Sequence, residues 1–541
     1  MLKPLGYATG IFGKWHLGHH KMFLPLQQGF DEYMGIPYSN DMWPVDYDGT
    51  PIAGTDHPLS FYPQLPFYEG NSKIEEILSL SDQNELTKRY TERAVDFIIK
   101  NKNKPFFLYL PHSMPHVPLG VSSQFKGKSK QGMYGDVMME IDWSVGQIMR
   151  TLSDNDLANN TLVIFTSDNG PWLNYGNHAG SVGNLREGKG TMWEGGSRVP
   201  CIMRWPEKIP KGLVSNQLAS TIDILPTIAA VTGAALPPKP IDGVNIESII
   251  YGNSETSPRN EYYYYYSGEL IAVRKDKMKL VFPHSYRSYE GYSPGNDGYP
   301  ATFNGVLGKY AVGKSGLALY NLESDPSEEK NIISENSEIA NKLKLLGDKA
   351  RSLFGDRLQG IKGNAVRPIG KMDRDRSISE LKIDHMGIGK TIKINSVYSD
   401  KYSGIGNNTV IDGLHGTLDF NGGNWQGYEA EDFEAIIDMG ELININEISC
   451  SFLKRQSSWI FTPTEVSLLT SNDGLSFKAV KNFYNQTEKN PAYEIKIFSQ
   501  KFEKLKTRFI KITAKNVKVC PEWHQGRGGK AWLFIDEIII K

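Results

Sequence analysis

Residues 13–18 read Gly13-Lys14-Trp15-His16-Leu17-Gly18 and put a cation and an imidazole two positions apart. The preceding residues are typical of a helix end, a glycine stop at Gly6 and a short strand that runs through Phe12. The charged segment therefore lies where a strand passes into a loop. This order predicts an open α/β sheet with a polar site at the carboxyl end of a parallel strand, the usual ligand position in such sheets.

Residues 1–254 alternate strand-like and helix-like patterns, which predicts a doubly wound parallel sheet. Helices are expected over 84–100 and over 137–152, where apolar residues recur at steps of three and four. Residues 35–68 have no clear period and are long for a loop, so we interpret them as a substrate-side insertion. The expected buried strands are 105–110, 162–166 and 199–203.

The pattern changes beyond this α/β region. Residues 255–356 contain short β runs and a helix near 338–354, which indicates a small antiparallel α+β subdomain. Residues 357–384 are basic and contain glycine, as linkers do. Residues 385–541 are β-rich with closely spaced turn signals, which predicts an all-β sandwich.

Composition excludes several classes of protein. The chain has 541 residues, 39% apolar and 22% charged, with a net charge of −1, which is ordinary for a globular protein and not for a nucleic-acid-binding one. No run approaches the ~18–20 apolar residues that span a bilayer, so we expect no transmembrane segment. Three cysteines are too few for a disulfide framework, although Cys450 and Cys520 could pair in an oxidising compartment, and Cys201 is expected to be a packed thiol.

Asp168 and Asn169 directly follow the expected strand 162–166. A carboxylate beside an amide carbonyl offers only oxygen, which suits a hard cation such as Ca²⁺ or Mg²⁺. The alternative from the residues alone is a turn, because Asp-Asn-Gly is strong turn chemistry.

Two further polar segments also adjoin expected strands. His112 and His116 follow the strand 105–110, and the prolines on both sides of His116 restrict its backbone. Lys189 stands between two glycines that would let the backbone approach a tetrahedral anion, and its ammonium is a compact positive charge.

The pattern Leu-Lys-x-x-Gly-Tyr-x-Thr-Gly-x-x-Gly-Lys-Trp-His-Leu-Gly over residues 2–18, together with residues 188–200, resembles the sulfatases of the alkaline-phosphatase-like superfamily, in particular the arylsulfatase A type. The resemblance implies that Lys14, His16, His116 and Lys189 are catalytic. It also implies that Lys14, His116 and Lys189 hold the sulfate ester and that Asp168 and Asn169 are Ca²⁺ ligands. Glu194 and Arg198 are expected to form a structural ion pair.

Two elements of that family are not found in this sequence. They are a pair of adjacent aspartates and a Cys/Ser-x-Pro-x-Arg motif, whose Cys or Ser becomes the formylglycine nucleophile. Only Ser113 and Ser324 stand two residues before a proline, and Val117 and Glu328 occupy the position of the arginine. We therefore expect an alkaline-phosphatase-like sheet that lacks its first strand region, no nucleophile in this chain and no turnover by it.

Residues 385–541 resemble a discoidin domain of the coagulation factor 5/8 type C kind, as appended to glycan-degrading enzymes. This implies a carbohydrate ligand, and Trp425, Trp459, Trp523 and Trp532 are candidates for stacking on sugar rings. Trp523, with His524 and Arg527 in the same loop, is the preferred candidate. The matching segments are 381–385, 410–413, 435–440, 465–474, 507–512 and 534–538.

The sequence as a whole predicts a sulfuric ester hydrolase that acts on sulfated carbohydrate and is periplasmic or secreted. One alternative is a phosphoester hydrolase of the same superfamily, with a Thr or Ser nucleophile and two metals. Another is a non-catalytic glycan-binding protein that keeps a remnant of a sulfatase core.

Overall fold

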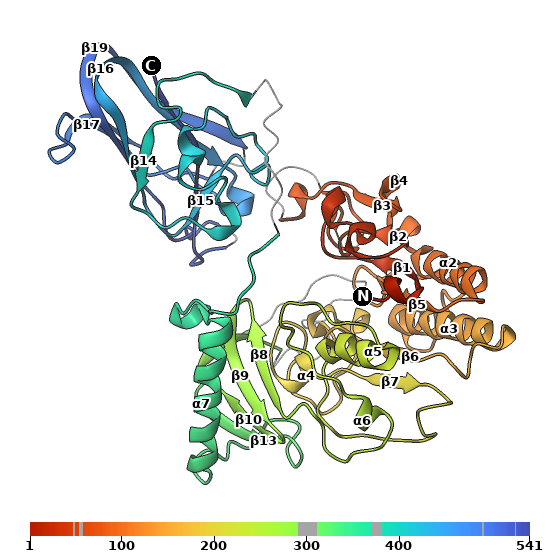
Figure 1. The fold of residues 1–541 in the computed structure, drawn as a ribbon. Coiled ribbons are helices and arrows are strands. Elements are labelled where there is room, and N and C mark those ends of the chain that lie inside the picture. Colours follow the sequence, from red (N-terminus) through yellow and green to blue (C-terminus); the bar gives the residue numbers. More distant parts are fainter. Residues whose placement is uncertain (47–48, 53–57, 290–310, 371–380, 490–491, 525) are drawn as a thin grey trace. The chain divides into compact units, whose positions relative to one another are not determined.

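A computed structural model describes residues 1–46, 49–52, 58–289, 311–370, 381–489, 492–524 and 526–541. The chain divides into two compact units (Figure 1). The first contains residues 1–52 and 62–366, and the second contains residues 53–61 and 367–541. Each unit has its own hydrophobic core. In the part of the chain that the model describes, no helix is both long enough and apolar enough to cross a membrane.

The main sheet of the first unit has the order β4-β3-β2-β1-β5. Strand β1 (Ala8–Lys14) pairs in parallel with β2 (Glu32–Ile36) and with β5 (Phe106–Tyr109), which confirms a parallel core around the strand that ends at Lys14. The outer strands β3 (Leu65–Glu69) and β4 (Ser72–Ile77) are antiparallel, so the predicted parallel pairing holds for the centre of the sheet and not for this edge.

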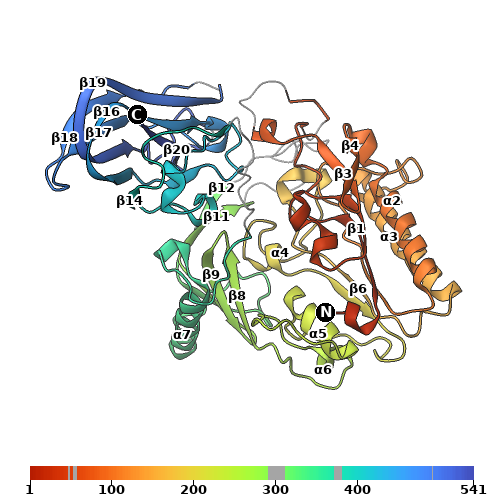
Figure 2. The same cartoon turned by 45° about the horizontal axis from the view of Figure 1, so that its top comes forward.

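Two helices predicted from their apolar periodicity cover this sheet. Helices α2 (Leu86–Asn101) and α3 (Gly132–Asp154) lie side by side (Figure 2). Phe97 of α2 packs against Phe12 of β1, with 5.7 Å between the ring centroids. The carboxyl ends of β1, β2 and β5 point to the same edge of the sheet, because the strands are parallel. The short helices of this unit are α1 (Leu80–Gln83), α4 (Glu194–Ser197) and α6 (Glu247–Ile250).

Strands β6 (Val163–Thr166) and β7 (Cys201–Arg204) form a separate antiparallel pair. The prediction that these strands are buried is wrong, since Phe165 is 37% and Ile202 is 66% exposed, and Cys201 is exposed as well. Among the described strands, β6 pairs only with β7, and the side chains of Phe165 and Ile202 stand on a face of this two-stranded ribbon that other elements leave largely uncovered.

The antiparallel strands and the helix that the sequence predicts after the α/β core are present, within the same compact unit. Strands β8 (Glu261–Tyr266), β9 (Glu269–Lys275), β10 (Met278–Val281) and β13 (Ala318–Asn321) form a sheet, and helix α7 (Ser337–Phe354) covers one face of it (Figure 1). Val273 and Leu280 of the sheet share a core with Leu343 of α7. Strands β11 (His284–Ser288) and β12 (Ala311–Ser315) form an additional antiparallel pair.

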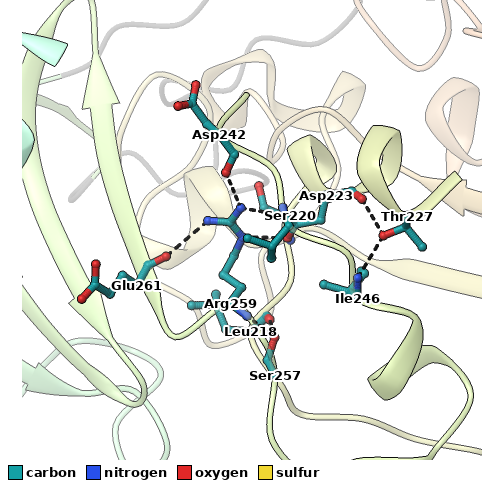
Figure 3. Close-up of polar contacts among 10 residues, drawn as sticks. Leu218, Ser220, Asp223, Thr227, Asp242, Ile246, Ser257, Arg259 and Glu261 are labelled. Atoms are coloured by element: carbon teal, nitrogen blue, oxygen red, sulfur yellow. Dashed lines mark hydrogen bonds and ion pairs between the residues drawn. The ribbon is translucent and has the colours of Figure 1, made fainter. Parts of the chain in front are cut away.

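A buried ion pair ties this subdomain to the α/β core (Figure 3). Arg259, just before β8, donates from Nε to the carboxylate of Asp223 at 2.7 Å, and the Asp223 side chain is fully buried. Asp223 precedes helix α5 (Ile224–Thr232), and its carbonyl accepts a hydrogen bond from Thr227. The Arg259 guanidinium also donates to the carbonyls of Asp242 and Glu261, so the start of β8 is fixed to the core.

The second unit is all-β and antiparallel, as predicted. Its sheet has the order β15-β20-β16-β19-β17-β18, and β14 also pairs with β16. Cys450 is buried in the core of this unit and Cys520 in a small separate cluster, and both are free thiols, so the possible disulfide does not form. The strands are β14 (Thr391–Ile394), β15 (Gln426–Glu429), β16 (Phe433–Lys454), β17 (Glu465–Ser471), β18 (Lys478–Tyr484), β19 (Glu494–Lys515) and β20 (Trp532–Ile540).

Candidate active site

Lys14 and His16 leave the sheet at the carboxyl end of β1, through a loop held by both neighbouring strands. The amide of Lys14 donates to the carbonyl of Pro111 at 2.8 Å, and the amide of Trp15 donates to that of Ile36 at 2.9 Å. Gly13 is required here, because it has a φ of +139° and an added Cβ would lie 2.0 Å from the Pro111 oxygen. At the Gly-Lys-Trp-His sequence two chain segments therefore lie in close contact, and this contact fixes where the lysine and the histidine leave the sheet.

His116 and Lys189, which are 73 residues apart, meet directly. Lys189 Nζ lies 2.8 Å from His116 Nε2, and His116 Nδ1 lies 2.6 Å from the carbonyl of Val117. Since the carbonyl can only accept, Nδ1 carries the proton and Nε2 accepts from the ammonium. Burial lowers the pKa of His116 to about 4, and the positive charge of Lys189 contributes to the shift. The imidazole is therefore neutral near pH 7.

Asp41 is a member of this cluster that the sequence patterns did not reveal. Its carboxylate lies 3.9 Å from His116 Nδ1 and opposes the fall in the pKa of that histidine. The adjacent Asn40 is fully buried and donates to the carbonyls of His116 and Pro118. Both residues closely follow the end of β2, so the rule that pointed to Lys14 would have found them if β2 had been recognised in the sequence.

His16 is exposed and faces the same group of charges. Partial burial lowers its pKa, and so does the ammonium of Lys14, whereas Asp41 and Asp168 raise it. Burial likewise lowers the pKa of Lys189 against the opposing effect of the two carboxylates. The structure thus gathers the predicted residues Lys14, His16, His116, Asp168 and Lys189 into one electrostatic cluster.

The segment that carries Lys189 is held by the antiparallel subdomain. The Tyr289 hydroxyl donates to the Lys189 carbonyl at 2.7 Å, and the Lys189 amide donates to the carbonyl of Pro171 at 2.8 Å. The carboxylate of Glu187 accepts from Ser288 Oγ and from the Tyr289 amide. Lys189 Nζ also lies 4.9 Å from the ring centroid of Trp172, a cation–π contact.

A buried ionic group stands behind this segment and corrects one prediction. Glu194 does not pair with Arg198, since its carboxylate contacts Lys279 Nζ at 3.1 Å. Lys279 also contacts Glu328 at 2.8 Å, and all three side chains are at most 2% exposed. Burial alone would lower the pKa of Lys279, but the carboxylates of Glu328 and Glu194 raise it. The partner is on β10, 85 residues away, and no local pattern points to it.

Asp168 and Asn169 lie directly after β6, where the sequence predicted a cation site. Asp168 is exposed and Asn169 is half-buried. Their oxygens fit Ca²⁺ in chemistry, but two adjacent residues supply fewer than the six to eight ligands that Ca²⁺ takes. Within the described ranges, no group of three or more His, Cys, Asp or Glu residues is arranged to hold a metal ion. The Ca²⁺ site stays a prediction.

His112 does not join the cluster. Its Nε2 lies 3.1 Å from Ser144 Oγ on α3, and its ring packs near Tyr90 of α2. Burial lowers its pKa to about 4. His112 therefore belongs to the packing between the sheet and the two helices.

The four candidate tryptophans of the second unit differ in how far their side chains are exposed. Trp425 is 1% exposed and part of the core, whereas Trp459 and Trp523 are 39% and 38% exposed. Trp532 is only partly buried, and it packs against the cluster around Trp425.

His524 lies between the two exposed rings, with ring centroids 6.4 Å and 5.9 Å from Trp459 and Trp523. It is itself buried. Its Nε2 donates to the Gln456 carbonyl and its Nδ1 accepts from the Gly526 amide, so both ring nitrogens are bonded within the protein, and its contact with a ligand stays a prediction. Arg527 is exposed in the same loop.

Lys14 and His16 at the end of β1, His116 in the segment after β5 and Lys189 in the loop before α4 together form a cluster whose two ammonium groups suit an anion. A family model described as Sulfatase matches residues 1–234, which include every residue of this cluster. A second model, described as N-sulphoglucosamine sulphohydrolase, C-terminal, matches residues 187–299.

Individual relatives agree with these models. Arylsulfatase G of Canis lupus familiaris is 32% identical over 393 residues, which are 67% of this chain and 70% of that protein. Arylsulfatase A of Bos taurus is 35% identical over 357 residues, or 63% of this chain and 67% of the relative. The solved PsFucS1 sulfatase from Pseudoalteromonas sp. is 26% identical with a TM-score of 0.54, over 65% of this chain and 72% of that one. This chain belongs to the sulfatase family.

The match to other relatives is shorter. The chain spans 59% of arylsulfatase G from Rattus norvegicus, at 36% identity over 52% of this chain. It spans 54% of the arylsulfatase G proteins of Mus musculus and Homo sapiens.

Proposed function

We propose that Lys14, His16, His116 and Lys189 form the sulfate site of a sulfuric ester hydrolase for carbohydrates, and that the 541 residues by themselves bind sulfate without turnover. The observation that carries the proposal is the contact of Lys189 Nζ with His116 Nε2 at 2.8 Å, inside a cluster that also contains Lys14 and His16. Membership of the sulfatase family supports sulfate ester hydrolysis as the reaction. A carbohydrate substrate is supported by a relative from Canis lupus familiaris named N-acetylgalactosamine-6-sulfatase, 36% identical over 61% of this chain and 62% of its own length.

The side chains have separable roles in this proposal. The ammonium groups of Lys14 and Lys189 stabilise the negative charge that builds on the sulfuryl oxygens, and they act strongly because the site is partly removed from water. Lys189 is also the proton donor to the departing alcohol, because its pKa is lowered and His116 is neutral. Asp41 orients His116. His16 is exposed and has a lowered pKa, so its imidazole serves as the base that accepts a proton.

The family mechanism also uses a formylglycine and a Ca²⁺ ion, and neither group takes any of the roles assigned to these four side chains. A formylglycine would supply the nucleophile, and the 541 residues contain no Cys/Ser-x-Pro-x-Arg motif to form it. A Ca²⁺ ion, held in part by Asp168 and Asn169, would orient that nucleophile and offset sulfate charge. A calorimetric Ca²⁺ titration of the wild-type chain and of Asp168→Asn tests the metal proposal, and equal heats would contradict it.

The purified 541-residue chain tests the main proposal in two ways. With an aryl sulfate and Ca²⁺ we expect no multiple turnover, whereas inorganic sulfate should bind and Lys14→Gln or Lys189→Gln should weaken that binding by about 10-fold or more. Lys21→Gln removes a charge outside the cluster and is the matched control. If the wild-type chain and the Lys14 and Lys189 variants bind inorganic sulfate with equal affinity, the proposed site is refuted. Tighter binding of phosphate than of sulfate, together with turnover of an aryl phosphate, would favour a phosphoester hydrolase.

We further propose that residues 385–541 form a discoidin-type module that binds carbohydrate and keeps a periplasmic or secreted protein near a polymeric substrate. Its support is the pair of exposed rings, Trp459 and Trp523, beside the exposed Arg527. Trp523→Ala should weaken retention on a polysaccharide without unfolding the sandwich, whereas loss of the buried Trp425 would cost roughly 3–5 kcal/mol of stability. Retention that survives loss of both exposed rings would contradict the proposal. Retention without sulfate binding by the first unit would instead favour the non-catalytic glycan-binding protein.

A further inference from the structure

Asn40 packs against the loop that carries His116, and its side chain is fully buried. Its amide nitrogen Nδ2 lies 3.1 Å from the His116 carbonyl oxygen, 3.0 Å from the Pro118 carbonyl oxygen and 3.2 Å from Gln83 Oε1. All three oxygens are acceptors, so the side-chain nitrogen of Asn40 and not its oxygen faces the loop. Asn40 therefore donates to the carbonyls on either side of Val117.

The carbonyl between these two is the one that the imidazole uses. His116 Nδ1 donates to the Val117 carbonyl oxygen at 2.6 Å, and this bond keeps the proton on Nδ1. Because Asn40 holds the carbonyls before and after it, the peptide plane that carries the Val117 carbonyl is restrained from both sides. Asn40 thereby fixes the acceptor that selects the tautomer of His116.

The tautomer of His116 decides how its ring meets Lys189. With the proton on Nδ1, Nε2 accepts a hydrogen bond from the Lys189 ammonium at 2.8 Å. With the proton on Nε2, two donors would face each other at this distance, and Nδ1 and the Val117 carbonyl would face each other as two acceptors. The Lys189 ammonium would then move away from the imidazole and from the position that it holds in the cluster.

Packing alone does not explain an amide at position 40. Asn40 Oδ1 is buried and has no hydrogen-bond partner among the residues that the structure describes, which is unfavourable for a polar atom. An apolar side chain of similar size would avoid this penalty, but it could not donate to the two carbonyls of the loop. Gln83 at the end of α1, also fully buried, holds the backbone of Asn40 by donating from Nε2 to its carbonyl at 2.9 Å.

We propose that Asn40 is a positioning residue of the sulfate site. By holding the carbonyls of His116 and Pro118, it keeps His116 in the Nδ1-protonated tautomer and so keeps the Lys189 ammonium where it meets the anion. The effect on the anion rests on the proposed function, whereas the effect on the tautomer is independent of it.

Nitrogen NMR of the full 541-residue chain with isotope-labelled histidine tests the effect on the tautomer. The shifts of Nδ1 and Nε2 show which nitrogen carries the proton, and the His116 signals are those lost in His116→Gln. At pH 7 the wild-type chain should show the Nδ1-protonated form, and Asn40→Leu should move His116 toward the Nε2-protonated form. The signals of His112, which bonds to Ser144 instead, should stay unchanged and serve as the internal reference.

Isothermal titration with inorganic sulfate tests the consequence for the anion. Asn40→Leu should weaken sulfate binding by about 10-fold, because it removes a contact that keeps the Lys189 ammonium in place. Gln83→Met is the matched control, since it removes a buried amide from the same arrangement and leaves both bonds from Asn40 to the loop. It should lower the melting temperature without changing the His116 tautomer or the sulfate affinity.

A second variant keeps the test decisive if Asn40→Leu does not fold. Asn40→Ser has a smaller side chain with one donor, and it should shift the tautomer in the same direction by a smaller amount. The inference is wrong if the folded Asn40 variants keep the wild-type tautomer, if Gln83→Met shifts it equally, or if the tautomer shifts while the sulfate affinity stays the same. Sulfate binding that is unchanged in Lys14→Gln and Lys189→Gln would instead refute the proposed function, and the tautomer comparison would remain interpretable.

Discussion

Replacing Lys279 by Met should destabilise the first unit far more than the loss of an ordinary surface charge. Lys279 is fully buried, and its Nζ contacts Glu328 at 2.8 Å, Glu194 at 3.1 Å and the Met192 carbonyl at 2.8 Å. With the cation removed, two buried carboxylates would face each other without compensation. Breaking a buried ion pair in this way typically costs about 3–5 kcal/mol.

Lys277→Met is the matched control, since Lys277 lies two positions away and pairs with Glu323. Both side chains of that pair are more than half exposed, and such pairs contribute about 0–1 kcal/mol. For a unit of this size a loss of 1 kcal/mol lowers the melting temperature by about 1.3 °C, so calorimetry at pH 7 should show the transition of the first unit about 4–7 °C lower in Lys279→Met and little changed in Lys277→Met.

The pH dependence adds a second test of the same reasoning. In Lys279→Met, burial without a cation raises the carboxylate pKa values in the folded state above those in the unfolded state. The deficit in stability should therefore be smaller at pH 5 than at pH 7, and Glu194→Gln with Glu328→Gln should recover most of it. Equal stabilities of Lys279→Met and Lys277→Met at pH 7 would refute the reasoning.

Three other expectations concern packing, pH and association in the first unit. Gly13→Ala should abolish folding of the α/β core or sulfate binding, because the added Cβ would lie 2.0 Å from the Pro111 oxygen. Gly6→Ala is the control, since the space around Gly6 is open and the substitution should cost only about 1 kcal/mol. Equal effects of the two variants in thermal melts would contradict this expectation. His112 has a pKa of about 4 in the folded state and 6.5 in the unfolded state, so the unfolded state binds more protons and the stability should fall as the pH drops from about 6.5 to about 4. In urea titrations, His112→Asn should reduce this dependence by up to about 1.4 kcal/mol per pH unit. An unchanged pH dependence would refute the assignment. Ile202→Lys should reduce self-association measured by light scattering, because Ile202 is 66% exposed on an open two-stranded sheet, and unchanged scattering would show that this edge does not associate.

Much of the fold and several site residues could be predicted because their signals are local. The strand before Lys14 and the helices near 84–100 and 137–152 follow from the spacing of apolar residues, and α2 and α3 lie there. The position of Lys14 and Asp168 at strand ends follows from the same local order. The sequence also indicates an all-β region beyond residue 385, because turn signals and alternation are properties of neighbouring residues.

The pairing of distant groups could not be predicted in this way. The partner of Glu194 is Lys279 and not the nearby Arg198, and Asp41 reaches His116 from a segment without any regular period. The exposure of Ile202 likewise depends on which distant segments cover the face of the β6–β7 ribbon.

The sequence by itself determined which residues are strand or helix formers and which chemical groups stand at the ends of the strands. Only the tertiary structure decided that Lys189 meets His116, that Glu194 pairs with Lys279, and that Trp459 and Trp523 are exposed. The physical reason is that periodicity and turn chemistry act over a few residues. Contacts, burial and pKa shifts instead depend on where segments tens of residues apart are brought together by the path of the chain.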